Sequence, residues 1–143
     1  MAQGIYYQTF GAGQPVLIIN GGPGLDSAGF EPVAKAIAAQ GFQSILFDQR
    51  GTGRSVLANI NADNIRLALM VQDIEHLRQH LQHDKLIILG HSFGGMLGAA
   101  YAAKYPQHIQ KLIFSPCPKA RRVIHAPRSE KWSPGRASFQ RIR

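Results

Sequence analysis

One serine in this 143-residue chain has the setting of a nucleophile. Ser92 stands in Gly90-His91-Ser92-Phe93-Gly94, directly after the apolar run 86–89. A G-x-S-x-G pattern between a strand and a helix predicts a sharp, strained turn that holds the serine hydroxyl exposed. A side chain on Gly90 or Gly94 would collide with its neighbour across the turn, which explains the glycines. We therefore predict that Ser92 is a nucleophile.

Backbone amides that could stabilise an oxyanion are predicted at two places. Phe93 opens the helix after Ser92, so its N–H has no intrahelical acceptor, and the helix dipole favours negative charge there. A second donor is expected from Gly21-Gly22, where missing side chains let the backbone approach a substrate carbonyl.

The remaining pattern predicts an α/β fold that positions these groups. Strands are predicted at 5–10, 16–19, 43–48, 86–89 and 111–115, and helices from 27 or 29 to 40, at 65–81 and at 93–104. The first strand leads into a hairpin-like reversal at 11–14, and Asn61 or Asp63 is the predicted N-cap of the second helix. This order implies a mostly parallel sheet with helices on its faces.

Three unusual loops are expected at the carboxyl ends of these strands, where open α/β sheets bind ligands. They are Asn20-Gly21-Gly22-Pro23-Gly24, Asp48-Gln49-Arg50-Gly51-Thr52-Gly53-Arg54-Ser55 and Gly90-His91-Ser92-Phe93-Gly94-Gly95. In this order and spacing they resemble the α/β-hydrolase superfamily and, more narrowly, the proline iminopeptidase group of serine peptidases. The resemblance covers roughly residues 5–118. This chain has Asn20 where the group usually has histidine.

The resemblance implies a mechanism and a set of site residues. Ser92 would attack an ester or amide carbonyl, and water would resolve the acyl-enzyme. By matched position the Phe93 and Gly22 amides form the oxyanion hole, with Gly21 an equally close candidate. The Asp-Gln-Arg loop supports the architecture in this group, so Asp48 and Arg50 receive no catalytic role.

The same resemblance implies a triad in the chain order Ser, Asp, His, with a helical cap before the last two. After Asp84 the sole carboxylate is Glu130, and after His91 the histidines are His108 and His125. None stands in a suitable context, so the triad acid and base are not identified. We expect a C-terminally truncated, partial α/β-hydrolase fold that lacks the cap and the last strands.

On this basis we expect a serine hydrolase most like a proline iminopeptidase, an enzyme that releases N-terminal proline from peptides. We expect its activity to be impaired by truncation. A carboxylesterase and a catalytically inactive hydrolase fragment are the alternatives. The expected substrate is a small peptide or ester. A sheet without its later strands would also expose an apolar edge, through which the chain could self-associate.

Charge divides the chain into a predicted body at 1–118 and a tail at 119–143. The body has eight Lys or Arg against seven Asp or Glu, whereas the tail has eight against one. The tail lacks helix or strand periodicity, so we expect it to be disordered and to bind polyanions nonspecifically. No nucleic-acid reader motif accompanies the charge, so no specific nucleic-acid partner is predicted.

No metal, cofactor or membrane partner is predicted. His76, His80 and His83 lie near a helix end, but the i, i+4 pair has no third ligand in a convincing place. The apolar runs are too short to cross a membrane. Cys117 is the single cysteine, which fits a reducing compartment and a cytoplasmic location.

Overall fold

The computed structural model describes residues 4–115 and 140–141, whose strands form one sheet. The sheet has six strands in the order β1-β3-β2-β4-β5-β6. Strands β2, β3, β4 and β5 are parallel to one another, and β1 and β6 pair antiparallel with β3 and β5 at the two edges. The strands are β1 (Tyr7–Phe10), β2 (Gln14–Ile19), β3 (Phe42–Phe47), β4 (Leu86–His91), β5 (Ile109–Ser115) and β6 (Gln140–Arg141).

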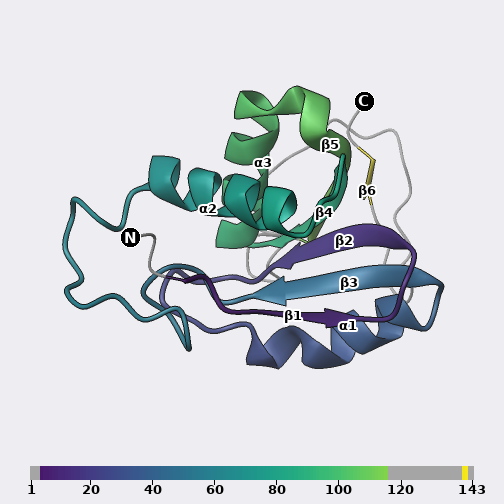
Figure 1. The fold of residues 1–143 in the computed structure, drawn as a ribbon, viewed down its shortest axis with the longest axis horizontal. Coiled ribbons are helices and arrows are strands. Elements are labelled where there is room, and N and C mark those ends of the chain that lie inside the picture. Colours follow the sequence, from purple (N-terminus) through teal and green to yellow (C-terminus); the bar gives the residue numbers. More distant parts are fainter. Residues whose placement is uncertain (1–3, 116–139, 142–143) are drawn as a thin grey trace, which may run out of the picture.

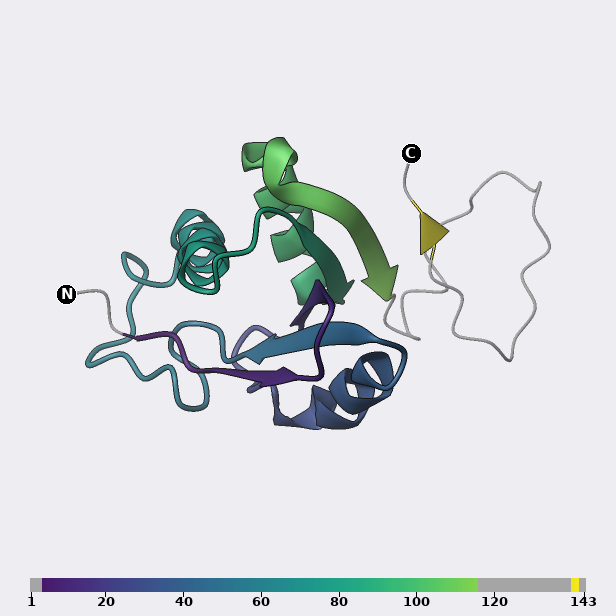
Figure 2. The same cartoon turned by 45° about the vertical axis from the view of Figure 1, so that its right-hand side comes forward.

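Helices cover both faces of the sheet, as the sequence predicts (Figure 1). A short 3₁₀ turn, η1 (Ala28–Phe30), leads into α1 (Glu31–Ala38), which packs on one face against β3. Helices α2 (Leu67–His80) and α3 (Phe93–Lys104) lie on the opposite face, and Figure 2 shows them on the side away from α1. A second 3₁₀ turn, η2 (Pro106–His108), precedes β5. The mostly parallel α/β architecture is confirmed.

Buried strand residues alternate between two apolar clusters, one on each face. Leu17 and Ile19 of β2 join the cluster under α2 and α3. Val16 and Ile18 of the same strand join the cluster under α1. Both faces of β2 are therefore buried, which explains why its sequence is a continuous aliphatic run.

The predicted reversal after the first strand is present, but the two strands do not pair with each other as they would in a hairpin. β1 runs antiparallel to β3, not to β2. The glycine turn packs tightly over the start of β3, because a Cβ on Gly11 would lie 2.7 Å from the Phe42 carbonyl oxygen and one on Gly13 would lie 2.3 Å from that of Gly41. This packing carries the chain from β1 across the start of β3 to β2.

The predicted N-cap of the second helix is also wrong. α2 begins at Leu67, and Arg66 occupies the N-cap position without a side-chain cap. The Asn61 side-chain oxygen instead accepts hydrogen bonds from the Asp63 and Asn64 N–H groups. Asn61 therefore shapes the loop before the helix, a common alternative use of this side chain.

The start of α3 approaches the sheet at the distance of backbone contact. A Cβ on Gly94 would lie 2.1 Å from the Ile19 carbonyl oxygen, and one on Gly90 would lie 2.5 Å from that of Gly94. Further along the helix, a Cβ on Gly98 would lie 3.0 Å from a methyl group of Ile88. The predicted steric need for glycine is confirmed at both positions, and at Gly90 the obstacle is the predicted neighbour across the turn. At Gly94 the predicted obstacle is wrong, because the Cβ would meet the backbone of β2 at Ile19.

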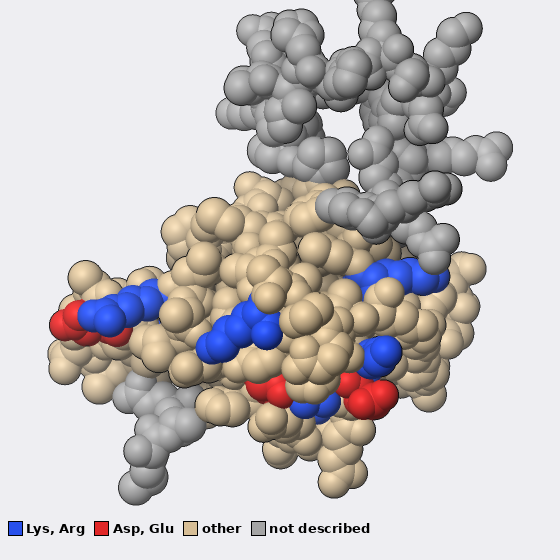
Figure 3. All heavy atoms as spheres, turned by 90° about the horizontal axis from the view of Figure 1, so that it is seen from above, with Lys and Arg blue, Asp and Glu red and all other residues tan. Residues whose placement is uncertain are grey.

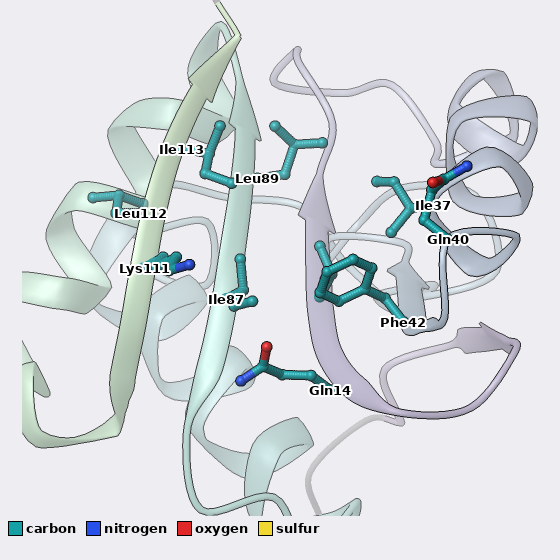
Figure 4. A pocket seen from close by; sticks show the side chains of 10 residues that line it. Gln14, Ile37, Gln40, Phe42, Ile87, Leu89, Lys111, Leu112 and Ile113 are labelled. Atoms are coloured by element: carbon teal, nitrogen blue, oxygen red, sulfur yellow. The ribbon is translucent and has the colours of Figure 1, made fainter. Parts of the chain in front are cut away.

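An open apolar groove runs along the α1 face of the sheet. It has a volume of about 490 Å³. Figure 4 shows Ile87 and Leu89 of β4 on one side, with Phe42 of β3 and Ile37 of α1 on the other.

The edge of the sheet at β5 is only partly covered. The short strand β6 pairs with β5 at Ile113 and Phe114. Within the described residues the outer edge of β5 from Ile109 to Leu112 has no strand against it.

A buried polar network joins α2, α3 and η2. The Glu75 carboxylate accepts hydrogen bonds from Arg78 at 2.7 and 3.0 Å and from the Tyr101 hydroxyl at 2.8 Å, and it lies 3.2 Å from His108 Nδ1. Burial alone raises the pKa of Glu75, but the hydrogen bonds and the Arg78 charge outweigh it and lower the pKa to about 2. The ionised form therefore stabilises the packing of these elements.

Except for β6, the predicted tail at 119–143 lies outside the described residues. None of the helices in residues 4–115 is long and apolar enough to cross a membrane.

Gly94→Ala is expected to lower the free energy of unfolding by more than about 3 kcal/mol, because the new methyl group must displace the backbone of β2. Chemical denaturation followed by circular dichroism measures the change. Gly29→Ala is the matched control, since a Cβ there meets no atom within 4 Å. Equal stability of the two variants would contradict the close contact.

Glu75→Gln is expected to lower the free energy of unfolding at pH 7 by roughly 3 kcal/mol. The folded-state pKa of Glu75 lies below its usual value of 4.5, so its contribution is complete above that pH and is lost as pH falls toward 2. The variant should therefore lose less stability than the wild type between pH 5 and 2, measured by urea unfolding at each pH.

Glu31→Gln is the control for this series. Glu31 pairs with Lys35 on the surface of α1, where exposed pairs contribute under about 1 kcal/mol. Parallel stability profiles of Glu75→Gln and the wild type would refute the role of the Glu75 network.

Self-association through the open part of the β5 edge is expected to appear as a sedimentation coefficient that rises with concentration. Gln110→Lys adds a charge to this edge and should move association to higher concentration. Gln107→Lys, on the exposed η2 turn, is the control and should behave as the wild type. A sedimentation coefficient independent of concentration would exclude this association.

Candidate active site

The turn between β4 and α3 holds Ser92 in a rare backbone conformation. Its φ and ψ angles are 52° and −117°, and the residue is exposed. The Ser92 N–H donates to the Ser115 carbonyl oxygen at the end of β5, 3.3 Å away. A non-glycine residue in this region is strained, and such strain persists where the surrounding structure enforces it. Here the close contacts of Gly90 and Gly94 enforce it.

The glycine loop after β2 rests directly against this turn. A Cβ on Gly21 would lie 3.2 Å from His91 Cδ2 and 3.4 Å from Ser92 Cβ. Gly22 follows with φ of +138°, a conformation that side chains rarely allow. The structure therefore brings Gly21 against His91 and Ser92, although they are some seventy positions apart in the sequence, and Gly22 is the next residue of the same loop.

Phe93 follows Ser92 as the first residue of α3. Its N–H consequently has no acceptor within the helix. The predicted donors thus belong to two elements that meet at the serine: the start of α3 and the loop after β2. An oxyanion bound between such amides would be stabilised by preorganised dipoles.

The loop after β3 is hydrogen-bonded to Ser27, which lies between the glycine loop and α1. One carboxylate oxygen of Asp48 accepts hydrogen bonds from the Ser27 N–H at 2.9 Å and the Ser27 hydroxyl at 2.7 Å. The other oxygen accepts from the Arg54 N–H at 2.9 Å. Burial raises the pKa of Asp48, but these hydrogen bonds dominate and lower it. Asp48 is thus held as an anion that joins two loops.

Arg50 extends these contacts to α2. It forms two hydrogen bonds of 2.6 Å to the Asp73 carboxylate and one of 3.0 Å to the Asn64 carbonyl oxygen. The pair is largely buried, with 17% and 10% of the two side chains exposed. These contacts agree with the architectural role that the resemblance implies for Asp48 and Arg50.

The His91 side chain contacts Ser115 and Phe30, which does not favour a role as the general base for Ser92. Its Nδ1 lies 3.3 Å from the Ser115 hydroxyl, and its ring packs 5.4 Å from that of Phe30. Within residues 4–115, no histidine or carboxylate hydrogen-bonds to the Ser92 hydroxyl. His108 lies in the Glu75 network, and His125 and Glu130 are outside the described residues. The triad acid and base stay unidentified.

The three histidines near the end of α2 do not gather around one point. His80 lies 3.1 Å from the Tyr7 hydroxyl, and burial and the charge of Arg78 lower the pKa of His83. Among the described residues no group of three or more His, Cys, Asp or Glu side chains could hold a metal ion.

Basic side chains do not gather into one patch on the face shown in Figure 3. On the face in Figure 3, Lys and Arg side chains stand at separate places, with acidic side chains beside some of them. The sequence up to residue 115 has the same mixture, with eight basic and seven acidic side chains.

Comparison with known proteins agrees with this geometry. The family model for the alpha/beta hydrolase fold matches residues 14–120. The proline iminopeptidase of Lactobacillus helveticus (strain DPC 4571) is 34% identical over 114 residues, which are 77% of this chain and 39% of that protein. The proline iminopeptidase of Heyndrickxia coagulans is 37% identical over 117 residues, or 79% of this chain and 40% of that protein.

Solved structures are similar over the same part of the chain. The proline iminopeptidase of Mycobacterium smegmatis has a TM-score of 0.68 at 27% identity, covering 76% of this chain and 38% of that one. An esterase from Exiguobacterium antarcticum has a TM-score of 0.68 at 29% identity, covering 78% and 40%.

The chain spans about two fifths of the length of the curated relatives it matches. The fold, the strained serine turn and the family match, which covers most of the chain, lead to one conclusion: this chain belongs to the α/β-hydrolase family.

Proposed function

We propose that this chain is the nucleophile-bearing part of a serine hydrolase that acts most like a proline iminopeptidase, releasing N-terminal proline from small peptides. The observation that carries the proposal is the exposed, strained Ser92 with the Gly21 backbone against its Cβ. The similarity to two proline iminopeptidases at 34% and 37% identity supports the choice of substrate.

In this mechanism the Ser92 hydroxyl oxygen attacks the carbonyl carbon of the scissile bond, and its proton passes to a base. The carbonyl oxygen becomes an oxyanion that the N–H groups of Phe93 and Gly22 stabilise, with Gly21 as the alternative to Gly22. Collapse of this intermediate expels the amine, which takes up a proton, and leaves an acyl group on Ser92. Water then hydrolyses the acyl-enzyme.

The proposal includes reduced activity for this chain alone. A serine without its base is a weak nucleophile, and no candidate base contacts Ser92 within residues 4–115. The oxyanion donors and the strained turn would still favour reaction with strong electrophiles. The proposal also includes a cytoplasmic location, which the single cysteine supports.

A carboxylesterase is the second candidate. The specific observation in its favour is that the esterase structure from Exiguobacterium antarcticum matches this chain with a TM-score of 0.68, the same as the proline iminopeptidase structure. Both activities would use the same nucleophile and oxyanion donors, so the acyl group would distinguish them.

A fluorophosphonate probe is expected to modify Ser92 in the folded protein, detected by intact-mass and peptide mass spectrometry. Ser92→Ala should abolish the modification, and Ser115→Ala, at the neighbouring strand end, should retain it. Faster release from a prolyl amide than from a simple acyl ester would favour the peptidase. If the probe does not modify the folded wild-type protein, the chain is a catalytically inactive hydrolase fragment.

A further inference from the structure

We propose that Asn20 is a positioning residue that sets the direction of the Gly22 N–H toward the oxyanion. The inference rests on the proposed function, because it assigns a role in the same oxyanion hole. It concerns the position at which this chain departs from the histidine that is usual in the resembling group.

The buried Asn20 side chain forms hydrogen bonds across the glycine loop. It is 1% exposed, and its Nδ2 donates to the Gly21 and Leu25 carbonyl oxygens, each at 2.9 Å. Both protons of the amide are thereby used, and its Oδ1 has no donor among the described residues. Rotating the amide by half a turn would place Oδ1 against two carbonyl oxygens, so the two donated bonds fix its orientation.

The first of these bonds acts on the predicted oxyanion donor. The Gly21 carbonyl and the Gly22 N–H belong to one trans peptide group, in which they point in opposite directions. Holding the carbonyl on Asn20 therefore directs the Gly22 N–H to the opposite side. Glycine flanks this peptide on both sides, so the peptide has unusual rotational freedom without such a bond.

Asn20 is itself anchored relative to the nucleophile. The Gln49 side chain donates to the Asn20 carbonyl oxygen at 3.0 Å, which ties it to the loop after β3. On the other side, Gly21 lies against Ser92. The peptide that Asn20 orients is therefore the one next to the reactive serine.

Asn20→Leu tests this role, because leucine fills a similar volume without donating hydrogen bonds. The limiting rate of Ser92 phosphonylation by a fluorophosphonate should fall at least about tenfold, while the probe concentration for half-maximal rate stays unchanged. Ser44→Ala is the matched control. It removes a buried side-chain hydrogen bond to the Ala34 carbonyl oxygen, away from the loop. It should reduce stability and leave the rate unchanged.

Asn20→Asp adds a readout that a purely structural role would not change, and it retains the side-chain shape if the leucine variant does not fold. Its ionised carboxylate cannot donate, whereas its protonated form can donate once. The ratio of its phosphonylation rate to that of the wild type should therefore rise as pH falls.

The two levels of the proposal fail in different ways. If the wild type and both Asn20 variants react with the probe equally fast, the role of Asn20 is overturned and Ser92 remains the nucleophile. A ratio for Asn20→Asp that is independent of pH would likewise overturn it. A folded wild type that does not react at all would overturn the proposed function itself.

Discussion

The contact between the start of α3 and the end of β2 is the constraint on which the site depends. Two backbone segments meet there with no room for a side chain, since a Cβ on Gly94 would lie 2.1 Å from the Ile19 carbonyl oxygen. This approach forces the turn at Ser92 to be tight and places the loop after β2 against it. The strain at Ser92 and the position of Gly21 are consequences of the same packing.

Polar contacts then hold the loops that this packing brings together. Asp48 binds the Ser27 and Arg54 segments, Gln49 binds the Asn20 backbone, and Arg50 binds Asp73 on α2. These groups are buried or nearly so, and a buried ionic partner that is lost is costly. The Asp-Gln-Arg sequence therefore links the sheet, the glycine loop and α2 and fixes their relative positions, consistent with a preorganised site.

Much of the fold followed from local patterns. The aliphatic runs of β2 and β4 predicted buried parallel strands, and the glycines at 90 and 94 predicted the serine turn, because sterics there are local. The pairing of β1 with β3 did not follow, since it depends on how the turn at Gly11 and Gly13 packs over β3. The side-chain hydrogen bonds of Asn20 could not be predicted from the sequence either, because they depend on the path of the loop from Asn20 to Leu25. A departure from the usual histidine was the one signal at that position.

The most direct measurement of the central claim is a crystal structure of the protein phosphonylated by a fluorophosphonate. The proposal places the phosphorus on Ser92 Oγ and its oxygen within about 3 Å of the Phe93 and Gly22 nitrogens. A phosphonyl oxygen that faces solvent, or that is bound by other groups while these two amides remain unengaged, would contradict the proposed oxyanion hole.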